Sequence, residues 1–155
     1  MIRKLEEGFR LFELEPAECL DSGKLKELEE RYGREEGCRI PRMAMQVHDI
    51  LTLHRVIEDP ALRGRGEECM WVSDRDWAYV CPVRVPQEEA EKYQYCGLRV
   101  GGVDTFADIY WNGEKTAEGE DVYLPLEAGL SGRCREENWL ILHIHSSRQK
   151  LEKMD

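Results

Sequence analysis

The dipeptide Asn112-Gly113 lies between two strand-like segments and constrains the local fold more than any other feature of this sequence. Phe106–Trp111 is rich in aromatic and β-branched residues, which favours an extended strand. Asn and Gly both tolerate positive φ angles, so the pair favours a tight type I′ turn, after which Glu114–Ala117 returns antiparallel. The sequence therefore predicts a hairpin in a twisted β-sheet, and this pattern by itself identifies no substrate.

The size and charge of the chain limit its fold and its partners. Its 155 residues suit one domain, which at this size buries roughly 70% of the surface of the unfolded chain. With 32 acidic and 22 basic residues, the formal net charge of -10 repels phosphate backbones and anionic lipid head groups. We therefore expect neither nucleic acid nor a membrane surface as a partner.

The apolar runs and the cysteines predict a cytoplasmic protein. No apolar run approaches the roughly 20 residues that cross a bilayer, and the N-terminus reaches Glu6-Glu7 before any signal-type segment. Without an export signal or Cys-x-x-Cys spacing, we interpret the cysteines as free thiols and expect no cofactor. The six are widely spread: Cys19, Cys38, Cys69, Cys81, Cys96 and Cys134.

The first part of the chain, residues 1–42, is charged and prone to form helices, and we expect it to belong to the same domain as residues 43–155. In this part, Phe9–Leu14 alternates as a strand does, and Lys24–Tyr32 places apolar residues on one face of a short helix. A second short helix is predicted over Met43–Arg55, followed by a loop from Ala61 to Glu68.

Beyond Met70 the apolar residues recur at every second position, as in a strand, and no longer at the spacing of a helix. The connections are too short for crossover helices, which favours antiparallel pairing of at least five strands. We therefore predict a mainly β fold, an antiparallel β-sandwich or jelly roll with one or two short N-terminal helices. The strand-like segments are Trp77–Val85, Lys92–Val100, Phe106–Trp111 and Asn138–His145.

Several short motifs, in order, resemble the N-terminal sugar-binding domain of family 2 glycoside hydrolases, especially the β-mannosidase-like branch. Three upstream segments also look like the entry segment of such enzymes: Val47–Leu51, Ile57–Pro60 and Glu68–Val72. The similarity runs from about Ile40 to Ser146. The motifs are Asp76-Trp77-Ala78-Tyr79, Gly102-Val103-Asp104-Thr105-Phe106-Ala107, Tyr110-Trp111-Asn112-Gly113, Leu124-Pro125-Leu126 and Asn138-Trp139-Leu140-Ile141.

The resemblance implies a galactose-binding-like jelly roll, normally followed by sandwich domains and a catalytic (β/α)₈ barrel that carries both catalytic glutamates. Such a barrel needs roughly 250 residues, so no catalytic residue is assigned and we expect no hydrolysis by this chain alone. The resemblance also implies closing strands beyond Asp155, so we expect an excised piece or a truncated gene product. An unpaired sheet edge would then invite a homodimer by strand addition.

The resemblance suggests Trp71, Asp76 and Trp77 as carbohydrate-binding residues, because related enzymes bring the loop before this strand towards the sugar. A tryptophan that opens a strand can equally anchor the core or a domain interface. Asp104 and Thr105 admit two interpretations as well, turn stabilisation or sugar contact. With side chains alternating between the two faces of the strand, Trp111 shares a face with Ile109, so we expect it to be buried.

His143 and His145 lie two apart on one predicted strand and share a face, as two metal ligands would. The sequence shows no third ligand, because His48 and His54 lie six apart in a separate predicted helix. We therefore expect surface or interface histidines and no metal.

The leading hypothesis is a non-catalytic sugar-binding or scaffold domain of a family 2 glycoside hydrolase of the β-mannosidase or β-galactosidase type. A stand-alone carbohydrate-binding module and a structural interaction domain are the alternatives.

Overall fold

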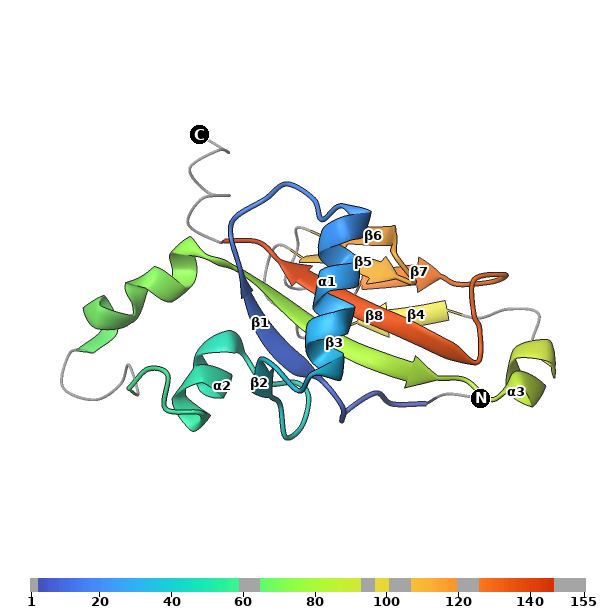
Figure 1. Ribbon diagram of the computed structural model, residues 1–155, viewed down its shortest axis with the longest axis horizontal. Coiled ribbons are helices and arrows are strands. Elements are labelled where there is room, and N and C mark those ends of the chain that lie inside the picture. Colours follow the sequence, from blue (N-terminus) through green and yellow to red (C-terminus); the bar gives the residue numbers. More distant parts are fainter. Residues whose placement is uncertain (1–2, 59–64, 93–96, 101–106, 120–125, 147–155) are drawn as a thin grey trace.

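Antiparallel strands dominate the computed structural model, which describes residues 3–58, 65–92, 97–100, 107–119 and 126–146 (Figure 1). Within these residues no helix is long and apolar enough to cross a bilayer. The elements in chain order are β1 (Arg10–Leu14), α1 (Ser22–Gly33), β2 (Cys38–Arg39), α2 (Val47–Leu53), the 3₁₀ helix η1 (Arg65–Asp74), β3 (Asp76–Arg84), α3 (Gln87–Lys92), β4 (Gly97–Val100), β5 (Ala107–Trp111), β6 (Glu114–Gly119), β7 (Leu126–Gly129) and β8 (Glu137–Ile144).

The strands of the described residues form two sheets. The larger has six strands in the order β2-β1-β3-β8-β5-β6, and the smaller pairs β4 with β7. Every pairing is antiparallel. This arrangement confirms the predicted mainly β, antiparallel fold with short N-terminal helices.

The predicted hairpin is present between β5 and β6. Asn112 and Gly113 have φ angles of 50° and 84°, as a type I′ turn requires. A β-bulge lies between Ile109 and Tyr110. Trp111 is buried in the same apolar cluster as Ile109, which confirms the prediction that it is a core residue.

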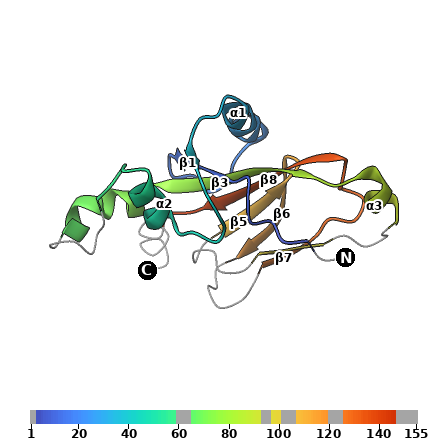
Figure 2. The same cartoon turned by 90° about the horizontal axis from the view of Figure 1, so that it is seen from below.

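The larger sheet buries both of its faces. Its inner face packs against the β4–β7 pair, and this inner core includes Trp77, Tyr79 and Ile109. Its outer face is covered by α1, whose Leu25 and Leu28 are buried against it. Figure 2 shows α1 on one side of the sheet and β7 on the other. A central strand such as β3 is therefore apolar at successive positions.

Helix α1 follows from its sequence. Asp21 caps the N-terminus by accepting a hydrogen bond from the backbone N–H of Lys24 at 2.7 Å. Leu25 and Leu28 are three residues apart and so share one face of the helix. At the other end, the ring of Tyr32 packs edge-on against Trp139 of β8.

Two predicted boundaries near the middle of the chain were wrong. The second helix begins at Val47 rather than Met43, because Gln46 has extended backbone with ψ of 157°. The last residues of the predicted loop from Ala61 to Glu68 belong to η1, which begins at Arg65. A 3₁₀ helix leaves little apolar periodicity to detect in a sequence.

The predicted strand Lys92–Val100 was also partly wrong. Its described strand is β4, Gly97–Val100, and Lys92 ends helix α3. Residues 93–96 lie outside the described part. Helix α3 has two acidic residues in its first turn, which favours a helix N-terminus, but it has no apolar face that would reveal it.

The prediction of free thiols is confirmed for cysteines whose side chains the structure describes. Cys19, Cys38 and Cys81 are free thiols. The side chains of Cys69 and Cys96 lie outside the described part of the chain.

Candidate functional site

The predicted carbohydrate-binding residues Trp71 and Trp77 lie close together where η1 leads into β3. Their ring centroids are 6.1 Å apart and their planes are tilted by 48°. Trp77 is 5% exposed, and its indole N–H donates to the carbonyl of Val72 at 2.9 Å. Trp71 is 38% exposed. Trp77 is therefore a core residue with its polar group satisfied, and Trp71 keeps an accessible aromatic face.

Asp76 points to the opposite face of the sheet from Trp77, as neighbouring residues of a strand do. It is 1% exposed, and its carboxylate accepts backbone N–H groups from Ala17 at 3.0 Å and Ser146 at 2.7 Å. The structure thus does not gather the three predicted residues on one surface. Sugar contact by Trp71, Asp76 and Trp77 stays a prediction.

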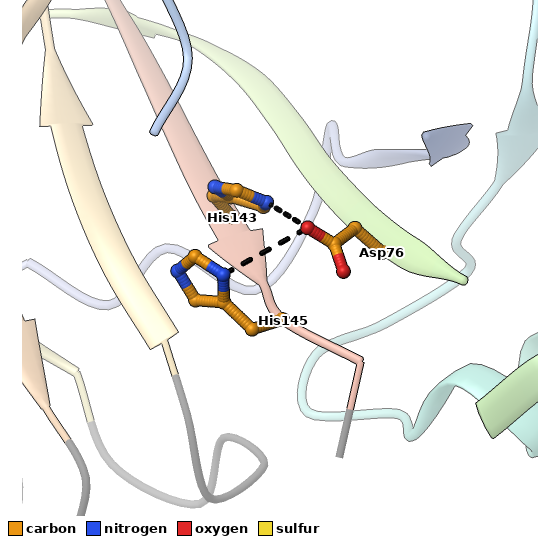
Figure 3. Close-up of side chains that lie close together, drawn as sticks. All are labelled: Asp76, His143 and His145. Atoms are coloured by element: carbon orange, nitrogen blue, oxygen red, sulfur yellow. Dashed lines mark hydrogen bonds and ion pairs between the residues drawn. The ribbon is translucent and has the colours of Figure 1, made fainter. Parts of the chain in front are cut away.

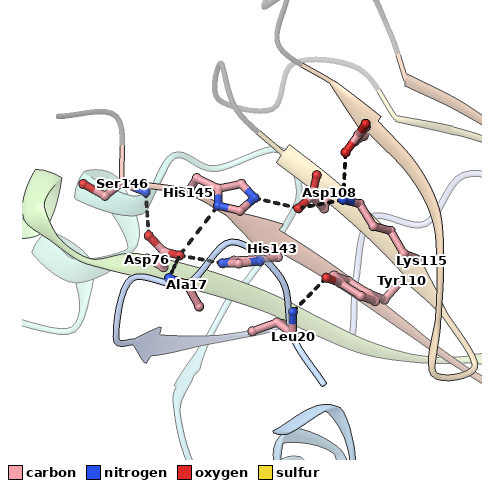
Figure 4. Close-up of polar contacts among 10 residues, drawn as sticks. Ala17, Leu20, Asp76, Asp108, Tyr110, Lys115, His143, His145 and Ser146 are labelled. Atoms are coloured by element: carbon pink, nitrogen blue, oxygen red, sulfur yellow. Dashed lines mark hydrogen bonds and ion pairs between the residues drawn. The ribbon is translucent and has the colours of Figure 1, made fainter. Parts of the chain in front are cut away.

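Asp76 belongs instead to a buried polar group on the outer face, here called the Asp–His cluster: Asp76, Asp108, His143 and His145 (Figures 3 and 4). The sheet register explains this meeting. His143 of β8 pairs with Ala78 of β3 on one side and with Asp108 of β5 on the other. Asp76 and His145 then lie at the same end of these strands and on the same face.

Each carboxylate of the Asp–His cluster contacts an imidazole. His143 Nε2 lies 2.6 Å from Asp76 Oδ2, and His145 Nε2 lies 2.6 Å from Asp108 Oδ2. His145 Nδ1 faces Asp76 Oδ2 at 3.7 Å, and the two rings have centroids 4.0 Å apart. His143 is 0% exposed and His145 is 7% exposed. These side chains therefore interact inside the protein and not with solvent.

The carboxylates of the cluster are held in their ionised form. Burial by itself raises the pKa of Asp76, but hydrogen bonds from His143, Ala17 and Ser146 outweigh it, and the net pKa lies below the ordinary value. Burial likewise raises the pKa of Asp108, and the hydrogen bond from His145 with the charge of Lys115 reverses that effect. Because both carboxylates are ionised acceptors, the ring nitrogens at 2.6 Å, His143 Nε2 and His145 Nε2, act as N–H donors.

The same face fastens the connection between β1 and α1 to the sheet (Figure 4). Ala17 donates to Asp76, and the backbone N–H of Leu20 donates to the hydroxyl of Tyr110 at 2.9 Å. Lys115 lies 3.7 Å from Asp108. These contacts fix the connection between β1 and α1 against the sheet at this end of the outer face.

The expectation of surface or interface histidines at positions 143 and 145 was wrong, because both are buried. Sequence reasoning found their common face but missed Asp108. A carboxylate inside a strand-like run of apolar residues was the available signal, since such a group is buried only with a partner. Asp104 and Thr105 lie outside the described residues.

The cluster is poorly placed for glycoside hydrolysis. That reaction needs two carboxylates on either side of a bound sugar, about 5 to 10 Å apart. Asp76 and Asp108 are both buried and already hydrogen-bonded to imidazoles. Within the described residues, this carboxylate pair offers no such opening.

Comparison with curated proteins finds β-mannosidases. The rat (Rattus norvegicus) β-mannosidase is 27% identical over 106 residues, covering 68% of this chain and 12% of the rat protein. The mouse (Mus musculus) β-mannosidase has the same identity and coverage. The chain thus spans about an eighth of the length of these relatives.

Comparison with solved structures supports the fold. The chain is similar to the β-D-mannosidase of Dictyoglomus thermophilum with a TM-score of 0.78 and 24% identity, covering 97% of this chain and 16% of that one. A β-glucuronidase of Ruminococcus gnavus has a TM-score of 0.56 and 19% identity, with 93% and 20% coverage. These likenesses confirm the expected galactose-binding-like sandwich.

A family description, "Glycosyl hydrolase 2 galactose-binding domain-like", matches residues 28–155. This match covers most of the sequence and includes β3, β5 and β8 with the Asp–His cluster. It also agrees with the family to which the strand and turn motifs pointed. The chain belongs to the glycosyl hydrolase 2 galactose-binding domain-like family.

Proposed function

We propose that this chain is a non-catalytic sugar-binding and scaffold domain of a family 2 glycoside hydrolase that acts in carbohydrate metabolism. The observation that carries the proposal is the family match over residues 28–155. The β-mannosidase relatives, of which the chain covers only 12%, support a larger parent enzyme. That parent cleaves β-linked sugars, with a β-mannoside as the preferred substrate class.

The domain's contribution in this proposal is structural, with one accessible aromatic side chain. Trp71 is exposed and its ring leans on the buried Trp77, which fixes its orientation. An aromatic face held in this way suits the apolar face of a sugar ring. Of the three predicted residues, Trp71 is thus the best candidate for a sugar contact, and the ring of Trp77 packs against it on its buried side.

The reading frame that follows the codon for Asp155 tests the proposal most directly. We expect it to continue into further sandwich domains and a (β/α)₈ barrel with two catalytic glutamates. The purified chain should release no nitrophenol from 4-nitrophenyl β-D-mannoside. Turnover by the chain alone would contradict the scaffold role.

A stand-alone carbohydrate-binding module is the second candidate, favoured by the exposed Trp71. Calorimetric titration of the chain with mannose and with galactose separates the two. The scaffold gives no saturable heat, whereas the module binds and loses that binding in Trp71→Ala. Met70→Ala is the matched control, because Met70 is the exposed apolar neighbour.

Two further parts of the proposal concern location and assembly. A cytoplasmic location is supported by the free thiols of Cys19, Cys38 and Cys81. A homodimer through a sheet edge would use β6, an outer strand of the larger sheet, whose Glu114, Lys115 and Glu118 carry charges. Edge charges weaken such pairing, so we expect a weak dimer that light scattering detects at high concentration, and a monomer under those conditions would contradict this part.

A further inference from the structure

In the Asp–His cluster, Asp76 lies beside His143 and His145 and supplies the third metal ligand that the sequence alone did not show. Asp76 Oδ2, His143 Nε2 and His145 Nδ1 all lie within 4.8 Å of one another (Figure 3). All three residues are buried, and they come from the beginning of β3 and the end of β8. We propose that this cluster binds one divalent transition-metal ion, with Zn²⁺ as the ion best suited to two imidazoles and a carboxylate.

The charge of the cluster favours a cation. Asp76 and Asp108 are buried, at 1% and 5% exposed, and each carboxylate contacts an imidazole. Among the described residues, the lysine or arginine that approaches them is Lys115, at 3.7 Å from Asp108. Two buried carboxylates and two imidazoles thus lie together in a place shielded from water. A divalent cation among them would be attracted by the carboxylates and bound by the ring nitrogens.

Hydrogen bonds from neighbouring groups orient two of the proposed metal ligands, His145 and Asp76. His145 uses Nε2 to donate to Asp108 at 2.6 Å, which leaves Nδ1 directed at Asp76. A carboxylate that fixes the second ring nitrogen is the usual outer partner of a zinc-bound histidine. Asp76 is oriented by the N–H of Ser146 on Oδ1, so Oδ2 is the oxygen that faces both rings.

Binding requires small shifts of the ligand side chains and a change of tautomer at His143. Donor atoms on a tetrahedral zinc ion lie about 3.3 Å apart for bonds of about 2.0 to 2.1 Å. The Asp76–His143 contact is 2.6 Å and the Asp76–His145 contact is 3.7 Å, so the first must lengthen and the second shorten. The proton on His143 Nε2 moves to Nδ1, the buried ring nitrogen that has no hydrogen-bond partner in the described chain. This tautomer shift releases no net proton.

The test titrates ZnCl₂, and separately CoCl₂, into the full chain after a chelator has removed any bound metal. We expect one equivalent of tightly held metal by calorimetry, a higher melting temperature, and intense visible bands from four-coordinate Co²⁺. Asp76→Asn and His145→Gln should each weaken binding by about 100-fold or more. Asp108→Asn, which removes only the outer partner, should weaken it by about 10- to 100-fold.

The chain has four histidines, and the two outside the cluster give the matched control. His48→Gln/His54→Gln, with His48 in α2 and His54 at its C-terminal cap, should keep the metal affinity unchanged. Binding that disappears in this control but persists in His145→Gln would overturn the proposal, as would an absence of binding to the wild-type chain. If the cluster variants fail to fold, crystals of the wild-type chain soaked in ZnCl₂ decide. An anomalous peak among Asp76, His143 and His145 supports the site, and peaks at other positions only contradict it.

Discussion

Asn112 and Asn138 are joined side chain to side chain, with Nδ2 of Asn112 donating to Oδ1 of Asn138 at 2.9 Å. Asn112 also accepts a hydrogen bond from the backbone N–H of Trp139 at 2.8 Å. Asn138 donates to the carbonyls of Val83 and Arg135. The turn of the β5–β6 hairpin is therefore tied to β8 and through it to the end of β3.

Replacing Asn138 by alanine should destabilise the fold strongly. Asn138 is buried, so its removal leaves several backbone and side-chain partners without a hydrogen bond. We expect a loss of about 2 to 4 kcal/mol in the free energy of unfolding, measured by urea denaturation. Glu137→Ala, at the exposed neighbouring position, should change it by less than about 0.5 kcal/mol. Equal effects of the two substitutions would refute the proposed role of Asn138.

Two glycines with similar backbone allow a matched comparison. Gly37 and Gly113 have φ angles of 80° and 84°. A Cβ on Gly37 would lie 2.7 Å from the carbonyl oxygen of Leu11 and 2.9 Å from the ring of Phe12, whereas nothing lies within 4 Å of one on Gly113. Gly113→Ala should cost about 1 kcal/mol from backbone strain alone.

Gly37→Ala should cost at least about 2 kcal/mol more than Gly113→Ala, because a steric clash with backbone adds to the same strain. The measurement is the difference in urea midpoint at an unchanged m-value. Equal midpoints for the two variants would mean that the segment around Gly37 shifts freely, contrary to its close packing on β1.

The packing of α1 on the outer face can be tested at Leu28, which is 0% exposed. Leu28→Ala should lower the free energy of unfolding by about 2 to 5 kcal/mol through lost burial and a cavity. Lys26→Ala, at an exposed position of the same helix, leaves helix propensity nearly unchanged and should be close to neutral. A loss below about 1 kcal/mol for Leu28→Ala would indicate that α1 contributes little to the core.

Burial of Cys81 should make the domain less stable at alkaline pH. Burial raises the pKa of its thiol to about 11. In the unfolded chain the thiol ionises near pH 9, so the folded state is favoured fully below that pH and loses this advantage as pH rises towards 11. The loss attributable to Cys81 is roughly 2 to 3 kcal/mol.

The check for Cys81 is the slope of stability against pH between 8 and 11 in the wild type and in Cys81→Ala. The variant loses the titrating thiol but keeps every tyrosine and lysine, so its slope should be smaller. Parallel slopes would show that other groups cause the alkaline loss.

The strand pattern was predictable because it is local. The strand-like segments at β1, β3, β5 and β8 and the Asn112-Gly113 turn are properties of neighbouring residues, and the structure confirms them. The expected period of two is not seen in β3 and β5, because the sheet is covered on both faces. Helices α3 and η1 have no sustained apolar face, so periodicity could not reveal them. The Asp–His cluster depends on strand order, since Asp76 and His143 are 67 positions apart and meet only because β3 pairs with β8.

Strand β3 is buried on both sides, with Ala78 and Val80 in the outer core and Tyr79 and Cys81 in the inner core. The two cores share this backbone but no side chain. On β3, an engineer who replaces α1 with a differently shaped helix would therefore redesign only the even-numbered residues Ala78 and Val80, leaving the odd-numbered residues that face β4 and β7 as they are. Natural variants of this domain should accordingly show correlated substitutions within each layer and few between the layers.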